Sequence, residues 1–258
     1  MKQLEVSANV NEGTMRPKII CHMMSSVDGR LVTERWSPPA AGIDKGLVSR
    51  VYEEVAGRLS AQGWVVGRTS MAPIAEGAHG DSPIPANNIG TGDRRTTFLG
   101  HRDGRDVAVA VDPSGKLRYG SNGTDNEHFV AVLGEGVSDA YLDELRSTGV
   151  SYLFAGPDGD DLASAMTTLT KDFGVDRLLL EGGGITNGTF LKGGLIDELS
   201  LLVFPGIDGL AGISSIFEYH GEADALPAAG KSLRLISSEV VDGGIVWLRY
   251  GFENAPRA

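Results

Sequence analysis

Short apolar runs alternate with segments of helical spacing along most of this chain, and that alternation limits the folds it can adopt. The runs have the length of strands and end at Gly, Pro or Asp residues. Between them, apolar residues recur every three or four positions, as they do on the buried face of an amphipathic helix. Strands that alternate with helices build a mostly parallel sheet covered on both faces, with right-handed crossovers. We therefore expect a three-layer α/β fold.

The boundaries of these runs predict where each element lies. Strands are expected at residues 18–24, 64–67, 107–111, 129–133, 151–155, 177–181 and 198–204. Helices are expected at 47–59, where Asp44 is placed to cap the start, at 138–146, at 161–173 and from the glycines at 182–184 to Leu191. Two last strands, at 232–238 and 244–252, read as an antiparallel hairpin that makes the sheet mixed.

The chain reads as one domain with a short leader. Residues 1–16 are expected to form a flexible leader, and residues 17–254 a single domain. Residues 73–106 are rich in Gly, Pro, Asn and charge, and long segments of this kind are commonly functional or mobile. We find no internal repeat and no linker to a second domain.

Composition and charge narrow the class of function. The chain has 258 residues, of which 41% are hydrophobic, and this is typical of a globular domain. Its net charge of −11 argues against a nucleic-acid groove, although backbone amides could still hold a small anion. No apolar stretch is long enough to cross a bilayer, and the polar N-terminus does not resemble a signal peptide. We expect a cytoplasmic enzyme with no membrane or nucleic-acid partner.

The sequence gives little support for a disulfide or a metal site. Cys21 is the one cysteine, so neither an internal disulfide nor a cysteine-rich zinc site can form. Cys21 lies in an apolar run and reads as a small buried hydrophobe, with a nucleophile as the alternative. No two histidines have the spacing of metal ligands, and we expect no metal site. The histidines are His22, His79, His101, His128 and His220.

The sharpest local pattern is Leu178-Leu-Leu-Glu181-Gly-Gly-Gly-Ile-Thr-Asn-Gly188. A buried strand leads to three glycines at the start of a helix, where free N–H groups and the helix dipole favour a phosphate. The pattern is neither G-x-G-x-x-G nor a P-loop, so a tight turn without a ligand is the alternative. Glu181 is either satisfied by nearby N–H groups or directed at a ligand.

Two other strand ends offer polar groups. Residues 66–69 end a strand with Gly67, Arg68 and Thr69, which supply a guanidinium and a hydroxyl. Ser114 and Lys116 follow the strand at 107–111. Each could contact a phosphate or belong to an ordinary solvated turn, and the sequence leaves both readings open.

Three separated segments together resemble the reductase domain of riboflavin biosynthesis, the RibD C-terminal family of the dihydrofolate-reductase-like fold. The first, at 22–30, reads H-M-M-S-S-V-D-G-R and is similar to that family's opening strand and turn. The second, at 65–69, reads V-V-G-R-T. The third reads L-E-G-G-G-I-T-N-G-T-F-L at 180–191 and is followed by G-L-I-D-E-L at 194–199. These pieces span residues 17–252 in the family's order.

The resemblance implies a mixed sheet with NADPH lying across the carboxyl ends of its strands. It implies a phosphorylated small-molecule substrate, a pyrimidine carrying a ribosylamino 5′-phosphate. C1′ of that sugar, as the ring-opened imine, would accept hydride and give a ribitylamino product. Members of the family also lead us to expect a homodimer. The fused zinc deaminase of many bacterial members cannot be built with one cysteine.

The resemblance also assigns roles to residues. Glu181 would face the substrate as the catalytic residue, and His22, Ser26 and Arg50 would complete the substrate site, with Arg58 as an alternative to Arg50. Asp28 and Gly29 would shape a turn. The cofactor would contact Ser25, Gly67, Thr69, Ser114, Gly182, Gly183, Gly184, Ile185, Thr186, Asn187 and Gly188.

One departure from the family pattern affects the substrate site. Members often carry lysine where this chain has His22. If His22 contacts a substrate phosphate, its protonation below about pH 6.5 should tighten binding. Two other functions remain open. One is a reductase of the same fold that acts on another small carbonyl, imine or pterin, and the other is a nucleotide-binding regulatory module without catalysis.

Overall fold

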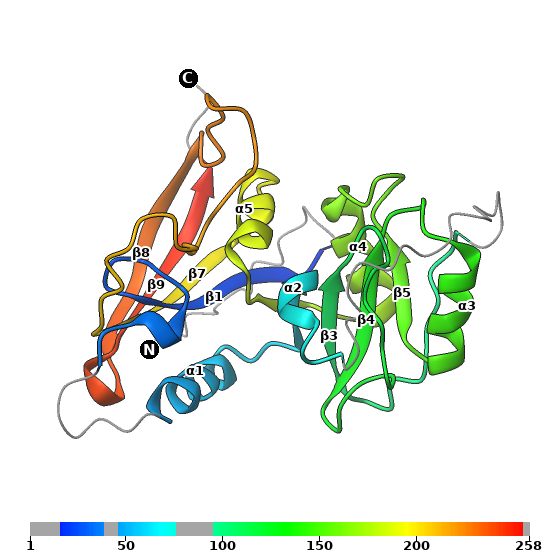
Figure 1. Ribbon diagram of the computed structural model, residues 1–258, viewed down its shortest axis with the longest axis horizontal. Coiled ribbons are helices and arrows are strands. Elements are labelled where there is room, and N and C mark those ends of the chain that lie inside the picture. The colour runs from blue at the N-terminus through cyan, green and yellow to red at the C-terminus, as the bar shows by residue number, and fades with distance from the viewer. Residues whose placement is uncertain (1–15, 39–45, 76–94, 255–258) are drawn as a thin grey trace, which may run out of the picture.

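The computed structural model describes residues 16–38, 46–75 and 95–254. Their strands form one nine-stranded sheet in the order β5-β4-β3-β2-β6-β1-β7-β9-β8 (Figure 1). The strands from β5 to β7 in this order run parallel, and β9 is antiparallel to both β7 and β8. The strands are β1 Lys18–Ser26, β2 Gly63–Gly67, β3 Asp106–Val111, β4 Glu127–Leu133, β5 Ser151–Phe154, β6 Arg177–Leu180, β7 Glu198–Phe204, β8 Lys231–Val240 and β9 Val246–Asn254.

Helices cover both faces of the sheet, which confirms the predicted three-layer α/β fold with a C-terminal hairpin. Residues of α4 and α5 share one buried cluster with the sheet, whereas α3 and α1 pack on the opposite face. The α-helices are α1 Leu47–Arg58, α2 Arg68–Met71, α3 Asp139–Thr148, α4 Leu162–Phe173 and α5 Gly184–Lys192, and the 3-10 helices are η1 Thr33–Arg35 and η2 Asp242–Gly244.

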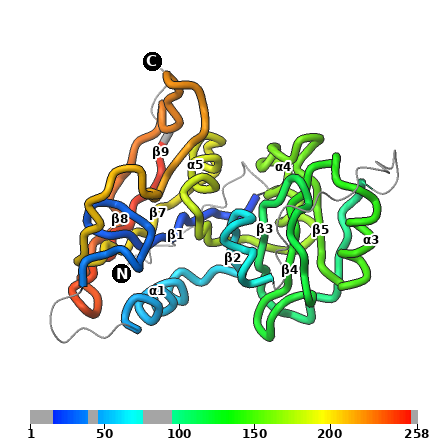
Figure 2. The backbone as a smooth tube through the Cα atoms, viewed as in Figure 1, coloured from blue at the N-terminus to red at the C-terminus, as the bar shows by residue number. Residues whose placement is uncertain are grey.

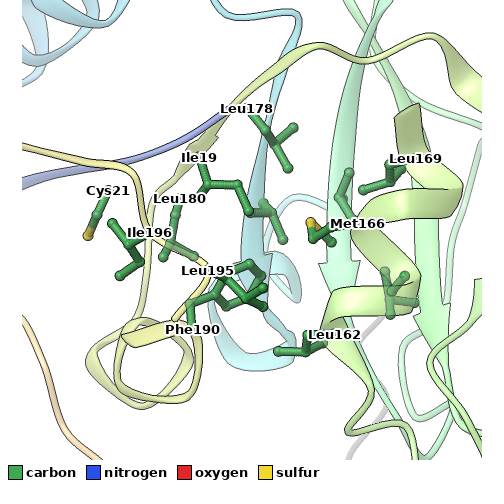
Figure 3. Close-up of a cluster of buried hydrophobic side chains, with 14 of the residues drawn as sticks. Ile19, Cys21, Leu162, Met166, Leu169, Leu178, Leu180, Phe190, Leu195 and Ile196 are labelled. Atoms are coloured by element: carbon green, nitrogen blue, oxygen red, sulfur yellow. The ribbon is translucent and has the colours of Figure 1, made fainter. Parts of the chain in front are cut away.

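The alternation of side chains along β1 shows how the two faces are divided. Ile19 and Cys21 point into the cluster formed with α4 and α5, which Figure 3 shows in close-up. Ile20 and Met24 point the other way, into the cluster formed with α1 and β9. Because successive residues of a strand face opposite sides, a strand buried on both faces is apolar at nearly every position. This explains why the central strands read as continuous apolar runs.

Two helices have side-chain caps at the residues where the sequence places their starts. Ser138 accepts a hydrogen bond from the Tyr141 amide at the start of α3, and Asp161 accepts one from the Ser164 amide at the start of α4. The helix α1 begins after Gly46 without a side-chain cap. Asp44, the predicted cap of that helix, lies outside the described residues.

The predicted irregular segments differ from the structure in two places. Arg16, which the sequence assigns to the leader, forms a bidentate ion pair with Asp197 at 2.7 and 2.9 Å. The rest of the leader lies outside the described residues. Within the long segment at 73–106, residues 76–94 are likewise outside them, but Phe98 pairs with Tyr152 in an antiparallel bridge. That part of the segment is therefore an edge of the folded domain.

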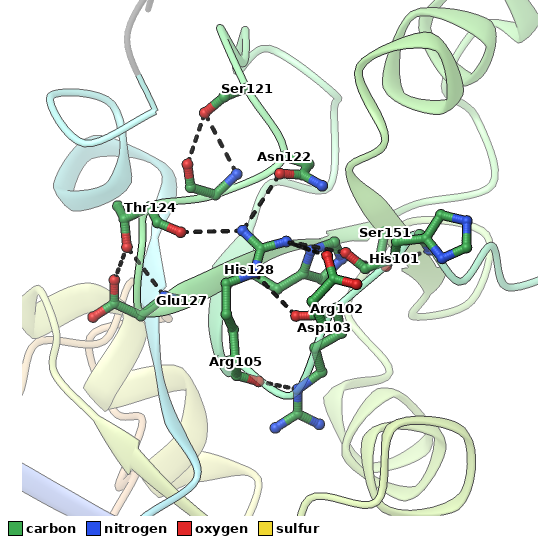
Figure 4. A network of polar contacts seen from close by, with 12 residues as sticks. His101, Arg102, Asp103, Arg105, Ser121, Asn122, Thr124, Glu127, His128 and Ser151 are labelled. Atoms are coloured by element: carbon green, nitrogen blue, oxygen red, sulfur yellow. Dashed lines mark hydrogen bonds and ion pairs between the residues drawn. The ribbon is translucent and has the colours of Figure 1, made fainter.

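The amino-terminal ends of β3, β4 and β5 are tied together by a polar cluster (Figure 4). The Arg105 guanidinium donates to the carbonyls of His101 and Thr124 at 3.0 and 3.1 Å. Nε2 of His128 lies 2.7 Å from the Ser151 hydroxyl. Burial lowers the pKa of His128 to about 4, and the positive charge of Arg105 acts in the same direction. This cluster joins loops at the edge of the sheet opposite the carboxyl ends of the parallel strands.

The central strands of the sheet lie between the two ends of the molecule, as the chain trace shows (Figure 2). The β8–β9 hairpin forms one end of the molecule and α3 with β5 forms the other. The strands β2, β6 and β1 lie between these ends, in the middle of the sheet order. Their carboxyl ends are where a parallel α/β sheet commonly binds its ligand.

Candidate active site

A cavity of about 350 Å³ opens at the carboxyl ends of β2, β3 and β6. Its walls come from the turn after β2, from the glycine turn after β6 and from the segment around Ser214. The position agrees with the expected place for a ligand in this class of sheet. The lining residues are Gly67, Arg68, Thr69, Ser70, Val111, Gly183, Gly184, Ile185, Thr186, Ser214 and Glu218.

The two turns that form the cavity contact each other through Gly67. The Gly67 amide donates to the Gly182 carbonyl at 2.9 Å. A Cβ at position 67 would collide with the Thr186 hydroxyl, so a larger residue would fit there only if Thr186 moved. Gly182 has a φ of +97°, a region that glycine adopts at no steric cost. The Gly182–Gly183 peptide bond is cis. Sequence reasoning identified both glycines but not their contact.

Gly183 leaves open the space in front of the first turn of α5. It is the N-cap of α5 and offers no side-chain cap. A Cβ built at Gly183 would meet only the Ser70 hydroxyl, at 3.9 Å, so a larger residue would project into the cavity. The first N–H groups of a helix have no intrahelical acceptor and attract anions. This turn therefore has the shape and donor chemistry of a phosphate cradle.

The later residues of the glycine motif have a packing role. A Cβ at Gly184 would collide with the Ser215 carbonyl, and one at Gly188 with the Glu218 carbonyl. The fully buried Asn187 donates to the Ile216 carbonyl at 2.8 Å. Gly184 still lines the cavity, but Asn187 and Gly188 do not. The structure thus separates the motif into a half that faces the cavity and a half that holds the 215–219 segment.

Ser25 and Ser26 lie buried at the end of β1, outside the cavity lining. The Ser25 hydroxyl donates to the Ser26 carbonyl at 3.0 Å, and the Ser26 hydroxyl donates to Asp28 at 2.6 Å. Asp28 also accepts from the Gly209 amide at 2.8 Å. These bonds, that of Ser26 first, lower the pKa of Asp28 to about 2. Asp28 therefore joins two loops, which agrees with its predicted role in a turn.

Glu181 is turned away from the cavity, toward α1. Leu178 and Leu180 pack on the α5 side of β6, and Leu179 packs on the α1 side, so the alternation continues to Glu181 on the α1 side. Burial raises the pKa of Glu181 to about 7, whereas a hydrogen bond with Tyr52 of α1 acts in the opposite direction. A carboxyl group with such a pKa can hold or release a proton near neutral pH.

His22 differs from its expected role. It is fully buried, with Nδ1 3.0 Å from the Ser200 hydroxyl and Nε2 3.3 Å from the Tyr52 carbonyl. Burial lowers the pKa of His22 to about 4. The expectation that its protonation near pH 6.5 tightens substrate binding is therefore wrong, because desolvation keeps the ring neutral.

The predicted arginine candidates and Ser114 lie outside the cavity. Arg50 pairs with Asp242 at 3.2 Å, and Arg58 pairs with Glu239 at 2.7 Å. Both pairs join α1 to the region of the β8–β9 connection. Ser114 is exposed in the turn after β3, although Val111 at the end of that strand does line the cavity.

The described part of the chain holds neither a reactive cysteine nor a group of side chains that could bind a metal. Cys21 is fully buried, and desolvation raises the pKa of its thiol, with the charge of Glu181 acting in the same direction. Among the described residues no three His, Cys, Asp or Glu side chains gather in a way that could hold a metal ion. Nor does any helix in those residues have the length and apolarity needed to span a membrane.

Sequence reasoning missed three polar residues near the site. Tyr52 follows the apolar spacing of α1, a pattern that does not distinguish it from a core residue, although it interacts with Glu181. Ser214 and Glu218 belong to a segment without a regular pattern, yet they complete the cavity wall. Glycines at 184 and 188, one helical turn apart, were the available signal that another segment packs closely on α5.

The fold and part of the sequence match known proteins. The chain can be superposed on a pyrimidine reductase-like protein of Corynebacterium diphtheriae with a TM-score of 0.63 and 16% identity, over 92% of each chain. Riboflavin biosynthesis reductase of Saccharomyces cerevisiae gives a TM-score of 0.57 and 14% identity, over 94% of this chain and 92% of the other. RibD of Acinetobacter baumannii gives 0.59 and 20%, over 93% of this chain and 59% of the other.

These structural likenesses establish the fold, and the sequence profile of the RibD C-terminal domain establishes the family. That profile matches residues 17–247, which is most of the chain. The matched range includes the glycine turn and the end of β1. The chain therefore belongs to the RibD C-terminal domain family, whose reductases act in riboflavin biosynthesis.

Proposed function

We propose that this chain is an NADPH-dependent reductase of a ribosylaminopyrimidine 5′-phosphate in riboflavin biosynthesis. Reduction at ribose C1′ would give the ribitylamino product. The observation that carries this proposal is the cavity between the Gly67 and Gly183 turns, with Glu181 immediately before the second turn. Membership of the RibD C-terminal domain family supports it. So do the names of similar structures, a pyrimidine reductase-like protein and a riboflavin biosynthesis reductase.

The residues around the cavity fit a dinucleotide. Amides at 183–186 and the hydroxyls of Thr69 and Thr186 would hold its phosphates and ribose, with Gly183 leaving the necessary space. When bound, the cofactor supplies the hydride for reduction. NADPH, rather than NADH, is proposed from the family resemblance. Ser25 and Ser114 remain candidate contacts for the ends of a long ligand that extends beyond the cavity.

The substrate is proposed to bind on the α1 side of the same turn. Glu181 is partly exposed there and is the proposed catalytic contact. Ser26 lies at the end of β1, next to β6 in the sheet, and remains a candidate for the substrate site. The chain's main contribution would be to hold donor and acceptor carbons close together and to exclude water from between them. Because His22 is buried and neutral, another residue would have to supply the positive charge that binds a substrate phosphate.

His22 and Arg50 favour a second candidate function, the reduction of another small carbonyl, imine or pterin. His22 is neutral and buried, and Arg50 is paired with Asp242 on the outer side of α1. Neither therefore presents a free positive charge to a substrate phosphate in this structure. An unphosphorylated substrate would not require one.

Side-by-side turnover assays separate these functions. The protein is mixed with NADPH and either the ribosylaminopyrimidine phosphate or dihydrofolate, and the loss of reduced-nicotinamide absorbance is followed. The proposal expects turnover with the first substrate and little with the second. Turnover of dihydrofolate alone would support the second candidate. NADPH binding with no oxidation by any candidate imine, carbonyl or pterin would instead indicate a regulatory nucleotide-binding module.

A matched pair of variants links turnover to the cavity. Thr69→Val removes a hydroxyl from the cavity lining, and we expect the KM for NADPH to rise about five- to tenfold, as for the loss of one hydrogen bond. Thr167→Val removes a similarly exposed hydroxyl from α4, away from the cavity, and should leave that KM unchanged. Equal effects of the two variants would contradict the binding of NADPH in this cavity.

The outermost strand supports the expected homodimer. Leu233 and Leu235 of β8 are 49% and 54% exposed, and such an apolar edge strand is a common place for a second chain to bind. We propose that two copies of the chain associate through β8 in the cytoplasm. Analytical ultracentrifugation should find a dimer for the parent and a monomer for Leu235→Lys. A monomeric parent at high concentration would contradict the dimer.

A further inference from the structure

Opposite charges enter the cavity from different parts of its wall. Among the described residues that line it, Arg68 carries the positive charge and Glu218 the negative charge. Glu218 belongs to the α5 part, because its amide donates to the Gly184 carbonyl at 2.9 Å. The Glu218 carboxylate accepts from the Ser215 amide at 3.0 Å. Arg68 is the first residue of α2, directly after β2. An anionic ligand group is therefore favoured on the α2 part of the wall.

The guanidinium of Arg68 is available to a ligand. Arg68 is exposed, and no described residue forms a hydrogen bond or an ion pair with its guanidinium. Other arginines near the carboxyl ends of the strands are engaged. Arg118 pairs with Glu144 at 3.5 Å. Arg30 donates to the Ile213 carbonyl at 2.7 Å. Because a guanidinium can donate to two phosphate oxygens at once, Arg68 suits a phosphate in this cavity.

Arg68 lies toward β3 as well as β2. The helix α2 contacts both strands (Figure 1). Burial raises the pKa of Asp112, the residue after β3, and the positive charge of Arg68 acts in the opposite direction. The Asp112 side chain is fully buried, and one of its oxygens accepts from the Leu117 amide at 2.8 Å. A ligand at this end of the cavity would therefore meet the Arg68 guanidinium and not the Asp112 carboxyl group.

The order of the strands gives the direction in which a dinucleotide would cross the cavity. Because β1, β6, β2 and β3 are successive neighbours, their carboxyl ends present Ser25, the glycine turn, Arg68 and Val111 in that order. Neighbouring strands are about 4.8 Å apart, so β3 lies roughly 10 Å from β6. With the nicotinamide toward Ser25 and Glu181 and the diphosphate at the glycine turn, the adenosine would lie over β2 and β3, beside Arg68.

We propose that Arg68 binds the 2′-phosphate on the adenosine ribose of NADPH and thereby makes this chain select NADPH over NADH. This role rests on the proposed function, because it takes the dinucleotide to cross the cavity in the direction given above. Hydrogen bonds between a guanidinium and a phosphate are roughly twice as strong as those between neutral groups. NADH carries a neutral hydroxyl in place of the 2′-phosphate, so it cannot form this charged contact.

Calorimetry with the two cofactors tests this role without any substrate. The parent should bind NADPH at least about tenfold more tightly than NADH. Arg68→Gln removes the charge, and its Kd should rise about ten- to a hundredfold for NADPH but less than about threefold for NADH. Arg68→Lys keeps the charge but not the planar group, so it should keep part of the preference. Both variants should fold, because no described residue bonds to the guanidinium.

Lys171→Gln is the matched control for net charge. Lys171 is exposed in the last turn of α4, and β6 begins soon after that helix, at the edge of the sheet opposite the cavity. This variant removes the same charge as Arg68→Gln, and its Kd for each cofactor should stay within about twofold of the parent value. An equal loss of NADPH affinity in the two variants would reduce the effect to net charge and overturn the role of Arg68.

Adenosine fragments give a second measurement, in which two ligands of equal charge are compared. The parent should bind adenosine 2′,5′-bisphosphate at least about tenfold more tightly than adenosine 3′,5′-bisphosphate, because only the first places a phosphate where NADPH has it. In Arg68→Gln the two affinities should become similar. A parent that binds the two isomers equally would overturn the role of Arg68.

The cofactor measurements also separate this role from the proposed function. Equal losses for NADPH and NADH in Arg68→Gln would place Arg68 at the diphosphate, and no loss would mark it as a solvated surface side chain. Either result overturns the role, as would equal affinity of the parent for the two cofactors, yet each leaves the dinucleotide site in place. Binding of neither cofactor to the parent would reject the proposed function together with the role of Arg68.

Discussion

The hydroxyl of Thr186 occupies the space that a Cβ at position 67 would need, so a side chain there would displace Thr186. This contact joins the first turn of α5 to the end of β2, and the hydrogen bond from the Gly67 amide to the Gly182 carbonyl reinforces it. Each of the two proposed phosphate-binding turns thus holds the other in place. A change at one of them should alter the cavity without unfolding the sheet.

Gly67→Ala should therefore weaken dinucleotide binding. The added methyl group pushes Thr186 away, and we expect the Kd for NADPH to rise at least tenfold by calorimetry, since small displacements of a binding turn are costly. Gly57→Ala is the control, because a Cβ at Gly57 in α1 meets nothing within 4 Å. That variant should gain roughly 0.5–1 kcal/mol of stability from helix propensity. Unchanged NADPH affinity in Gly67→Ala would contradict this account of the turn.

The two buried histidines should make the protein sensitive to acid. His22 and His128 have pKa values lowered to about 4 by burial, whereas the unfolded chain titrates near 6.5. Their contribution to stability is complete above about pH 6.5 and is lost as pH falls toward 4, because the unfolded state then binds more protons. The free energy of unfolding from urea titrations should decline across that window.

A substitution isolates the contribution of His128. His128→Gln should reduce the loss of stability between pH 6.5 and 4, by roughly 1–2 kcal/mol, because one titrating group is removed. His101→Gln changes an exposed histidine of the same region and should leave the slope unchanged. The prediction is wrong if both variants follow the parent curve.

Much of the fold could be predicted because its signals are local. The strand at β6, the glycine turn and α5 follow one another without a gap, so apolar pattern and glycine chemistry identify them together. Ser138 and Asp161 mark helix starts within one turn of their partners. The one-turn helix α2 was not predicted, because four residues give no periodicity.

The contacts behind Glu181 could not be predicted in the same way. Tyr52 reaches Glu181 only because α1 crosses the face of the sheet at one particular register, and no local pattern sets that register. His22 could be placed in a strand, but the side to which it points decides between a ligand contact and the core. The structure places it against Tyr52 and Ser200, in the core.

Leu169 tests the packing of α4 on the sheet. It is fully buried in the cluster of Figure 3, so Leu169→Ala should cost about 2–5 kcal/mol of unfolding free energy. Leu226→Ala should change stability by less than about 0.5 kcal/mol, because Leu226 is 72% exposed. Chemical denaturation of both variants checks the contrast, and a small loss for Leu169→Ala would place α4 differently from this structure.

A crystal structure of the protein with NADPH tests the central claim most directly. We predict the diphosphate against the amides of residues 183–186, between Gly67 and Gly183, with the nicotinamide ring beside Glu181. A dinucleotide bound elsewhere on the protein, or none bound at saturating concentration, would contradict the account.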